Sequence, residues 1–406
     1  MGSASTYSFD SIIDRRNTYA IKYDFEGKGK PEGTIPLWVA DMDFAAPPCV
    51  TEALAQNARH GVFGYSDTDA AYFETLRRWF AKRFGWTPEP SWHFKTPGVV
   101  LALYTAVRAF TEKGDAILIQ EPVYYPFASS ARDNERKLVV SRLVRERDGN
   151  GEETGRYEID FDDFEKKIIQ EGVKLFILCN PHNPVGRAWA KDELARLGDI
   201  CLRRGVKVFS DEIHQDFVYP GCRHTVFAGI SDALADITAT ATAPSKTFNL
   251  AGLEASNIFI KDRGLRAAFA QAYARTGLSQ NPVTGLVACK AAYDGGEGWL
   301  DALLVYLQGN IELIARAVSS WQERNAGIGF CPPEATYLGW IDFRALGLGD
   351  KDLDDWLTKQ AKVWLSPGRT FGAGGSGFMR INFACPKSVL SDALGRITDA
   401  LQNFPG

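Results

Sequence analysis

Short apolar runs alternate with amphipathic stretches through the middle of the chain, and this alternation predicts strands that alternate with helices. Amphipathic helices are expected at 98–110 and 192–204. The run VKLFILC at 173–179 is apolar enough to be buried on both faces of a sheet. The other predicted strands lie at 115–120, 137–143, 206–210, 237–243 and 255–260. This order is typical of an α/β fold in which helices cover a mostly parallel sheet.

The two ends of the chain follow other patterns. Residues 1–50 contain few helical periods and several prolines, which indicates an arm. The elements predicted outside the central region are helices within 50–84, a long helical stretch from Gln271 to Arg324, and strands near 337–342 and 378–383. We therefore expect an N-terminal arm that contributes to the small domain at 1–50, a large domain at 51–285, and a smaller α+β C-terminal domain at 286–406.

Composition narrows the class of protein. The chain has 406 residues, of which 45% are hydrophobic, so it can build a large core and is not a disordered chain. Its 46 basic and 50 acidic residues nearly balance, and a chain without a basic field is a poor partner for nucleic acid. No apolar run is long enough to cross a bilayer, and residues 1–10 lack the pattern of a secretory signal. No membrane or nucleic-acid partner is expected.

Cysteines and histidines add two expectations. The seven cysteines are scattered and form no C-x-x-C pair, which argues against a disulfide framework and favours a reducing, cytoplasmic location. The five histidines lack the spacing of metal ligands, so no metal is expected.

Polar side chains follow three of the predicted strands, at the point where each strand ends. Asn183 follows 173–179, Asp211 follows 206–210, and Lys246 follows 237–243. Ligands of open parallel sheets bind beyond these carboxyl ends. Pyridoxal phosphate needs an amine for a Schiff base with its aldehyde, a carboxylate that keeps its ring nitrogen protonated, and a donor to its phenolic oxygen. Lys246, Asp211 and Asn183 meet these needs in turn, so the residues predict a pyridoxal phosphate site.

Two further features fit that cofactor. Gly98, Val99 and Val100 open a predicted helix, and the backbone N–H groups at a helix start bind phosphate. Tyr124 follows the strand at 115–120 and is placed to stack on an aromatic ring. Each feature also has an ordinary structural explanation, as a plain helix start and as a core tyrosine.

A set of motifs is spread from about residue 9 to residue 401. They are LWVADMDF at 37–44, HGVFGYS at 60–66, NPHNPVG at 180–186, SDEIHQDF at 210–217, APSKTFNLAGL at 243–253, PEATYLGWIDF at 333–343, SPGRTFG at 366–372 and GFMRINFACP at 377–386. Through these motifs the chain resembles the fold-type I pyridoxal phosphate enzymes of the aminotransferase class I/II superfamily. Within that superfamily it is most similar to the bacterial and fungal cystathionine β-lyase, or carbon–sulfur lyase, branch.

The resemblance implies a role for each matching residue. Lys246 would form the Schiff base, Asp211 would pair with the pyridinium nitrogen, and Asn183 would hold the phenolic oxygen. Arg380 would clamp the substrate α-carboxylate by a two-pronged hydrogen bond. Tyr65 would reach the phosphate of the neighbouring subunit, because this family builds each site across a homodimer. The other implied contacts are Gly98, Val99, Val100 and Ser245 to the phosphate, Tyr124 to the ring face, and Ala40 and Asn183 to the substrate.

Some positions stay open at this level. His214 stands where many aminotransferases have a tyrosine that touches the phenolic oxygen, and it is equally well a core histidine. Trp38, Ala40, Asp41 and Asp43 either shape the substrate entrance or merely dock the arm. Glu254 lies eight residues after Lys246, where many aminotransferases have an arginine for the phosphate. The lyase branch lacks that arginine as a rule, so Glu254 favours a lyase.

The resemblance implies β-elimination from cystathionine, cysteine or another S-substituted cysteine, with pyruvate, ammonia and a thiol as products. An aminotransferase of an amino acid is the first alternative, and a pyridoxal phosphate-bound regulatory protein is the second. The same residues would serve elimination and transamination, so the motifs do not decide between them.

Overall fold

In the described residues of the computed structural model (7–25, 29–323 and 327–404), a seven-stranded sheet forms the centre of the large unit. Its order is β2 (His93–Thr96), β10 (Ser256–Ile260), β9 (Thr238–Thr242), β8 (Lys207–Asp211), β7 (Val173–Cys179), β3 (Ala116–Glu121) and β4 (Lys137–Arg142). From β9 to β4 all neighbours are parallel, whereas β10 runs antiparallel to both β9 and β2. The prediction of an α/β fold with a mostly parallel sheet is confirmed.

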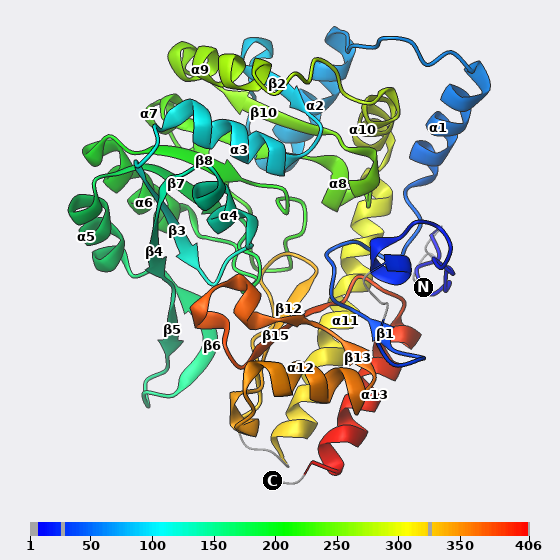
Figure 1. Ribbon diagram of the computed structural model, residues 1–406. Coiled ribbons are helices and arrows are strands. Elements are labelled where there is room, and N and C mark those ends of the chain that lie inside the picture. The colour runs from blue at the N-terminus through cyan, green and yellow to red at the C-terminus, as the bar shows by residue number, and fades with distance from the viewer. Residues whose placement is uncertain (1–6, 26–28, 324–326, 405–406) are drawn as a thin grey trace.

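Helices cover both faces of this sheet because the inner strands are apolar on both sides (Figure 1). In β7, Leu175 and Ile177 belong to the core beneath α3 (Val99–Phe110), α4 (Pro126–Asp133) and α9 (Arg263–Ala274). Phe176 and Leu178 belong to the core beneath α5 (Phe161–Glu171), α6 (Lys191–Arg204) and α7 (Asp232–Asp236). Successive side chains of a strand point to opposite faces, so this one run serves both layers.

A second, antiparallel sheet forms the C-terminal unit. Its order is β11 (Gly329–Phe330), β12 (Leu338–Asp342), β15 (Phe378–Asn382) and β14 (Ser366–Pro367), packed with α12 (Asp350–Lys359) and α13 (Lys387–Gln402). The arm joins this unit, since β1 (Ile35–Pro36) pairs in parallel with β13 (Val363–Trp364). Figure 1 shows α11 (Glu297–Gln322) running from the large unit down to the C-terminal one. The predicted boundaries at 50 and 285 remain a proposal.

The long helical stretch predicted from Gln271 to Arg324 is helical for most of its length, but it is interrupted. It divides into the end of α9, then α10 (Val283–Gly295) and α11, while Arg324 lies outside the described residues. Gly277 adopts a φ of +74° just after α9, and Pro282 directly precedes α10. A left-handed residue and a proline both interrupt helical hydrogen bonding. The apolar periodicity of the sequence continues across this segment, although its backbone is not helical.

The other helices of the large unit are α1 (Pro48–His60), α2 (Ala70–Phe84) and the single turn α8 (Pro244–Thr247). A hairpin of β5 (Val144–Arg147) and β6 (Glu153–Glu158), which the hydrophobic pattern did not predict, reaches from the large unit to the C-terminal one. Its Arg145 forms an ion pair with Asp342 at 2.8 Å. No helix in the described part of the chain is both long and apolar enough to span a membrane.

Candidate active site

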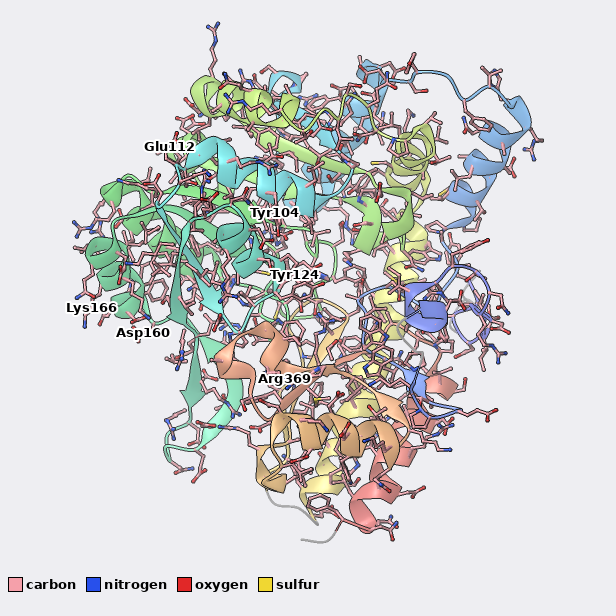
Figure 2. The ribbon with its side chains drawn as sticks, viewed as in Figure 1. Tyr104, Glu112, Tyr124, Asp160, Lys166 and Arg369 are labelled. Atoms are coloured by element: carbon pink, nitrogen blue, oxygen red, sulfur yellow. The ribbon has the colours of Figure 1, made fainter. Side chains whose placement is uncertain are left out.

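A cavity of about 820 Å³ lies at the carboxyl ends of the parallel strands, between the two units. Asn183 reaches it from the loop after β7, Asp211 from the end of β8, and Lys246 from α8, just after β9. The structure therefore brings together the three residues that the strand ends suggested. Figure 2 shows Tyr124 at the edge of the large unit that faces the C-terminal unit, where Arg369 lies. The other predicted residues that line the cavity are Ala40, Gly98, Val99, Val100, Tyr124, His214, Ser245 and Arg380.

The Lys246 amine is held at one point by a backbone carbonyl. Its Nζ donates a hydrogen bond to the Ala40 oxygen at 2.7 Å. The pKa of Lys246 is lowered to about 8, chiefly because the amine is removed from water and also because the cation of Arg380 is near, while the carboxylates of Asp41 and Asp211 act in the opposite direction. Near neutral pH a useful fraction of this amine is unprotonated. The unprotonated amine can act as a nucleophile and as a base.

Asp211 is a buried carboxyl group at the end of β8. Burial raises the pKa of Asp211 to about 7, against the lowering effects of the Ile213 N–H, which donates to it at 3.2 Å, and of Lys246. A cationic group placed against this carboxylate would favour its ionised form. Asp211 is thus suited to a ring nitrogen that must stay protonated.

Arg380 lies on β15 and is buried against the same cavity. Its Nη1 donates to Asn183 Oδ1 at 3.0 Å, and its Nη2 donates to the Trp38 carbonyl at 2.8 Å. Burial lowers the pKa of Arg380 to about 10, so the guanidinium remains a cation at neutral pH. The buried Nε has no hydrogen-bond partner within the protein. A cation that keeps an unused donor in a cavity is ready to bind a carboxylate.

His214 and Tyr124 also line the cavity. Burial, together with the positive charges of Lys246 and Arg380, keeps the pKa of His214 well below its usual value, so the ring is neutral. Its buried Nδ1 has no partner within the protein. Burial raises the pKa of Tyr124 to about 12, so this phenol stays protonated. Both side chains can offer neutral hydrogen bonds or ring contacts to an aromatic ligand.

The segment 37–44 forms one wall of the cavity and is held from several sides. The Ala40 carbonyl accepts a second hydrogen bond from the Tyr337 hydroxyl at 2.9 Å. The Asn382 amide donates to the carbonyls on either side of Ala40. Ser366 donates to the Trp38 carbonyl at 2.7 Å. Tyr337, Asn382 and Ser366 all lie within the quoted motifs, but no local pattern marks them as part of the site, because their role depends on contacts with the distant arm.

The start of α3 provides the phosphate-binding geometry. Gly98 caps this helix with a φ of +126° and without a side-chain cap. That backbone region is open to glycine and strained for other residues. The first N–H groups of a helix have no intrahelical partner, and here they line the cavity beside Ser245. Glu254, which lies eight residues after Lys246, also lines the cavity.

Tyr65 is not part of this cavity within one chain. It lies in the loop between α1 and α2 and is 97% exposed. It borders a separate surface hollow together with Lys95 and Gln280. Its expected contact with a neighbouring subunit therefore remains a prediction.

Taken together, the residues around the cavity fit pyridoxal phosphate. The cavity contains an amine, a buried carboxyl, an amide and a helix start, and three buried polar atoms of its lining residues, Trp38 Nε1, His214 Nδ1 and Arg380 Nε, lack partners within the protein. Among the described residues there is no group of three or more His, Cys, Asp or Glu side chains that could hold a metal ion.

Comparison with known proteins agrees with this geometry. Residues 32–397 match the family described as Aminotransferase class I and II. Cystathionine beta-lyase PatB of Bacillus subtilis (strain 168) is 43% identical over 396 residues, which is 97% of this chain and 100% of that protein. The structure of cystalysin from Treponema denticola, which contains pyridoxal 5'-phosphate, is 38% identical with a TM-score of 0.92 and covers 98% of this chain and 99% of its own. A pyridoxal phosphate-bound C–S lyase from Staphylococcus hominis is 36% identical with a TM-score of 0.88 over the same shares.

Proposed function

Since this chain belongs to the aminotransferase class I and II family, we propose that it is a pyridoxal phosphate-dependent carbon–sulfur β-lyase. The observation that carries this is similarity over almost the whole chain to a protein named as a cystathionine β-lyase. The predicted superfamily, fold class, cofactor and enzyme class are confirmed. In the proposed reaction the Cβ–S bond of an S-substituted cysteine breaks and the sulfur leaves as a thiol. Water then releases the remaining carbon skeleton as pyruvate and the nitrogen as ammonia.

Each predicted site residue that lines the cavity has a proposed role in binding the cofactor or the substrate. Lys246, Asp211, Asn183, Ser245 and the start of α3 would hold the cofactor. Arg380 would bind the substrate α-carboxylate, because it is a buried cation with a free donor. Bound pyridoxal phosphate supplies an electron sink for the electron pair left at Cα when the proton is removed.

Lys246 is the group that moves protons. Its lowered pKa lets the neutral amine take the Cα proton near neutral pH. The Ala40 carbonyl keeps the amine at one position and then accepts a hydrogen bond from the ammonium that results. That ammonium can then give its proton to the departing sulfur. His214 is neutral and so adds no charge that would disfavour the ammonium.

A product assay tests this function against transamination. The holoenzyme should release pyruvate and thiol in equal amounts from cystathionine or another S-substituted cysteine with no keto acid present. Alanine, which has no leaving group at Cβ, serves as the control and should yield no more than one equivalent of pyruvate per active site under the same conditions. Product formation that requires pyruvate or oxoglutarate as an acceptor would instead identify an aminotransferase.

We also propose a cytoplasmic homodimer with active sites shared between subunits. Support for the location comes from the cysteines, all of which are free thiols. Support for the shared site comes from Tyr65, since a tyrosine that is almost fully exposed in one chain is available to a second copy. The loop that carries it also exposes Val62 and Phe63. Apolar side chains grouped in this way are typical of a protein–protein contact.

Complementation between two inactive chains tests the shared site. A mixed dimer of a Tyr65→Phe subunit and a Lys246→Ala subunit should contain one complete site and recover up to about half of the wild-type activity, because a two-fold interface places Tyr65 of each subunit at the site of the other. If each site is built from one chain only, mixing should give no more activity than the Tyr65→Phe homodimer contributes. Tyr19, another exposed tyrosine, provides the control through Tyr19→Phe, which should behave as wild type in both arrangements.

A further inference from the structure

Two cations and two carboxylates form a compact cluster in the arm, next to the active site. Arg15 forms ion pairs with Asp41 at 2.6 Å and with Asp43 at 2.8 Å. Lys22 forms an ion pair with Asp43 at 2.6 Å and lies 3.7 Å from Asp41. The Lys22 side chain is completely buried, which is rare for a lysine and requires paired charges around it.

This arm cluster (Arg15, Lys22, Asp41 and Asp43) is joined by one peptide bond to the Lys246 contact. Asp41 directly follows Ala40, whose carbonyl receives the hydrogen bond from the Lys246 amine. Arg15 also donates to the Met42 carbonyl at 3.1 Å, so it holds the backbone as well as the carboxylates. A shift of Asp41 must therefore move or rotate the Ala40 carbonyl.

The arm cluster also contributes to the charges that surround Lys246. Asp41 acts from segment 37–44, Asp211 from the end of β8, and Arg380 from β15. The other titratable groups around the cavity include the neutral His214, the Tyr337 phenol, Tyr124 and Glu254. Among these groups only Asp41 has its charge balanced by residues of the arm.

We propose that Arg15 and Lys22 are positioning residues of the active site, which hold Asp41 and Asp43 so that the Ala40 carbonyl meets the Lys246 amine and the charge of Asp41 is balanced. The arm is then part of the catalytic machinery and more than a docking strand. This inference rests on the proposed role of Lys246. It also answers the question left open for Asp41 and Asp43, which dock the arm and shape the site at once.

The loss of Arg15 should change the pKa of Lys246 in a predictable direction. Without it, the nearest cation to Asp41 is Lys22 at 3.7 Å, so the carboxylate acts more strongly on Lys246. A less balanced negative charge favours the ammonium form and raises the pKa of Lys246 above about 8. A rise of about one pH unit would reduce the neutral fraction at pH 7 roughly tenfold.

Competitive acetylation can measure the pKa of Lys246 without any enzymatic turnover. The full-length protein, freed of pyridoxal phosphate, is labelled with acetic anhydride over a series of pH values, and mass spectrometry follows the peptide that contains Lys246. In Arg15→Met the midpoint of labelling should move to higher pH by about one unit. Arg15→Lys, which keeps the charge, should restore most of the wild-type midpoint. Arg16→Met is the matched control, because Arg16 is exposed and pairs only with the exposed Asp14 among the described residues.

A second variant keeps the test decisive if Arg15→Met folds poorly. Asp41→Asn removes the carboxylate itself, so the midpoint for Lys246 should move to lower pH, opposite to the Arg15→Met shift. An unchanged midpoint in Asp41→Asn, or equal shifts in Arg15→Met and Arg16→Met, would overturn the proposal. Neither result would affect the lyase assignment, which depends on pyruvate release by the holoenzyme.

Discussion

Lys246→Ala is expected to lower kcat by at least about 10³-fold, because a positioned acid–base group alone contributes roughly 10² to 10⁴-fold and this amine is also the proposed anchor of the cofactor. The amine points into the cavity from α8 and is held by the Ala40 carbonyl. No other lysine among the described residues that line the cavity can replace it. Steady-state pyruvate release measures the loss, and the visible absorption band of the bound cofactor should disappear or shift at the same time.

Lys174→Ala is the control for this variant. Lys174 lies on β7, in the same sheet, but its side chain is exposed to solvent. It should keep wild-type activity and the wild-type spectrum. Substantial activity in Lys246→Ala would contradict the assignment of this residue, whereas loss of activity in both variants would point to unfolding.

Asp211→Asn is expected to lower kcat/KM by roughly 150- to 5,000-fold. Breaking a buried ion pair by removal of one charge costs about 3–5 kcal/mol, which corresponds to that range. The amide has nearly the same shape as the carboxyl group, so the change removes charge and leaves packing largely intact. Asp232→Asn, at an exposed position of the same unit, should have no comparable effect.

The same residue predicts a pH dependence of cofactor binding. Burial raises the pKa of Asp211 to about 7 in the cofactor-free protein, so the group is increasingly protonated as the pH falls through 7. A protonated acid must lose its proton before it can pair with a ring cation, so the affinity for pyridoxal phosphate should weaken below that pH. Equilibrium dialysis of wild-type protein should show this fall, and Asp211→Asn should lack it. An equal pH dependence in the two proteins would assign the titration to another group.

The strand pattern could be read from the sequence with good accuracy, and the candidate residues at the strand ends lie around one cavity. Val173–Cys179 is predicted and observed with the same bounds, because a short apolar run flanked by polar residues marks a buried strand without reference to distant residues. Asn183, Asp211 and Lys246 were found because each follows such a run. The interruption between α9 and α10 was missed, since periodicity continued through Gly277 and Pro282 and hid the local breaks.

Other parts depended on contacts that no local pattern describes. The hairpin of β5 and β6 is polar, and its position is decided partly by Arg145 and the distant Asp342. The burial of Lys22 also depends on tertiary contacts. From the sequence it would be predicted to be an ordinary surface lysine, because nothing local shows that the carboxylate of Asp43 lies beside it. Such pairs form only when the chain has folded, since their partners come from separate segments.

By itself, the sequence determined the alternation of strands and helices, the residue types at the strand ends and the class of cofactor that they suit, because these follow from periodicity and from the chemistry of single side chains. Only the tertiary structure decided that Lys246 meets Ala40, that Arg380 meets Asn183 and that the arm balances Asp41. The tertiary structure also decided the protonation of the site. The pKa of a group depends on its burial and on charges that folding brings near it, and both are properties of three-dimensional distance.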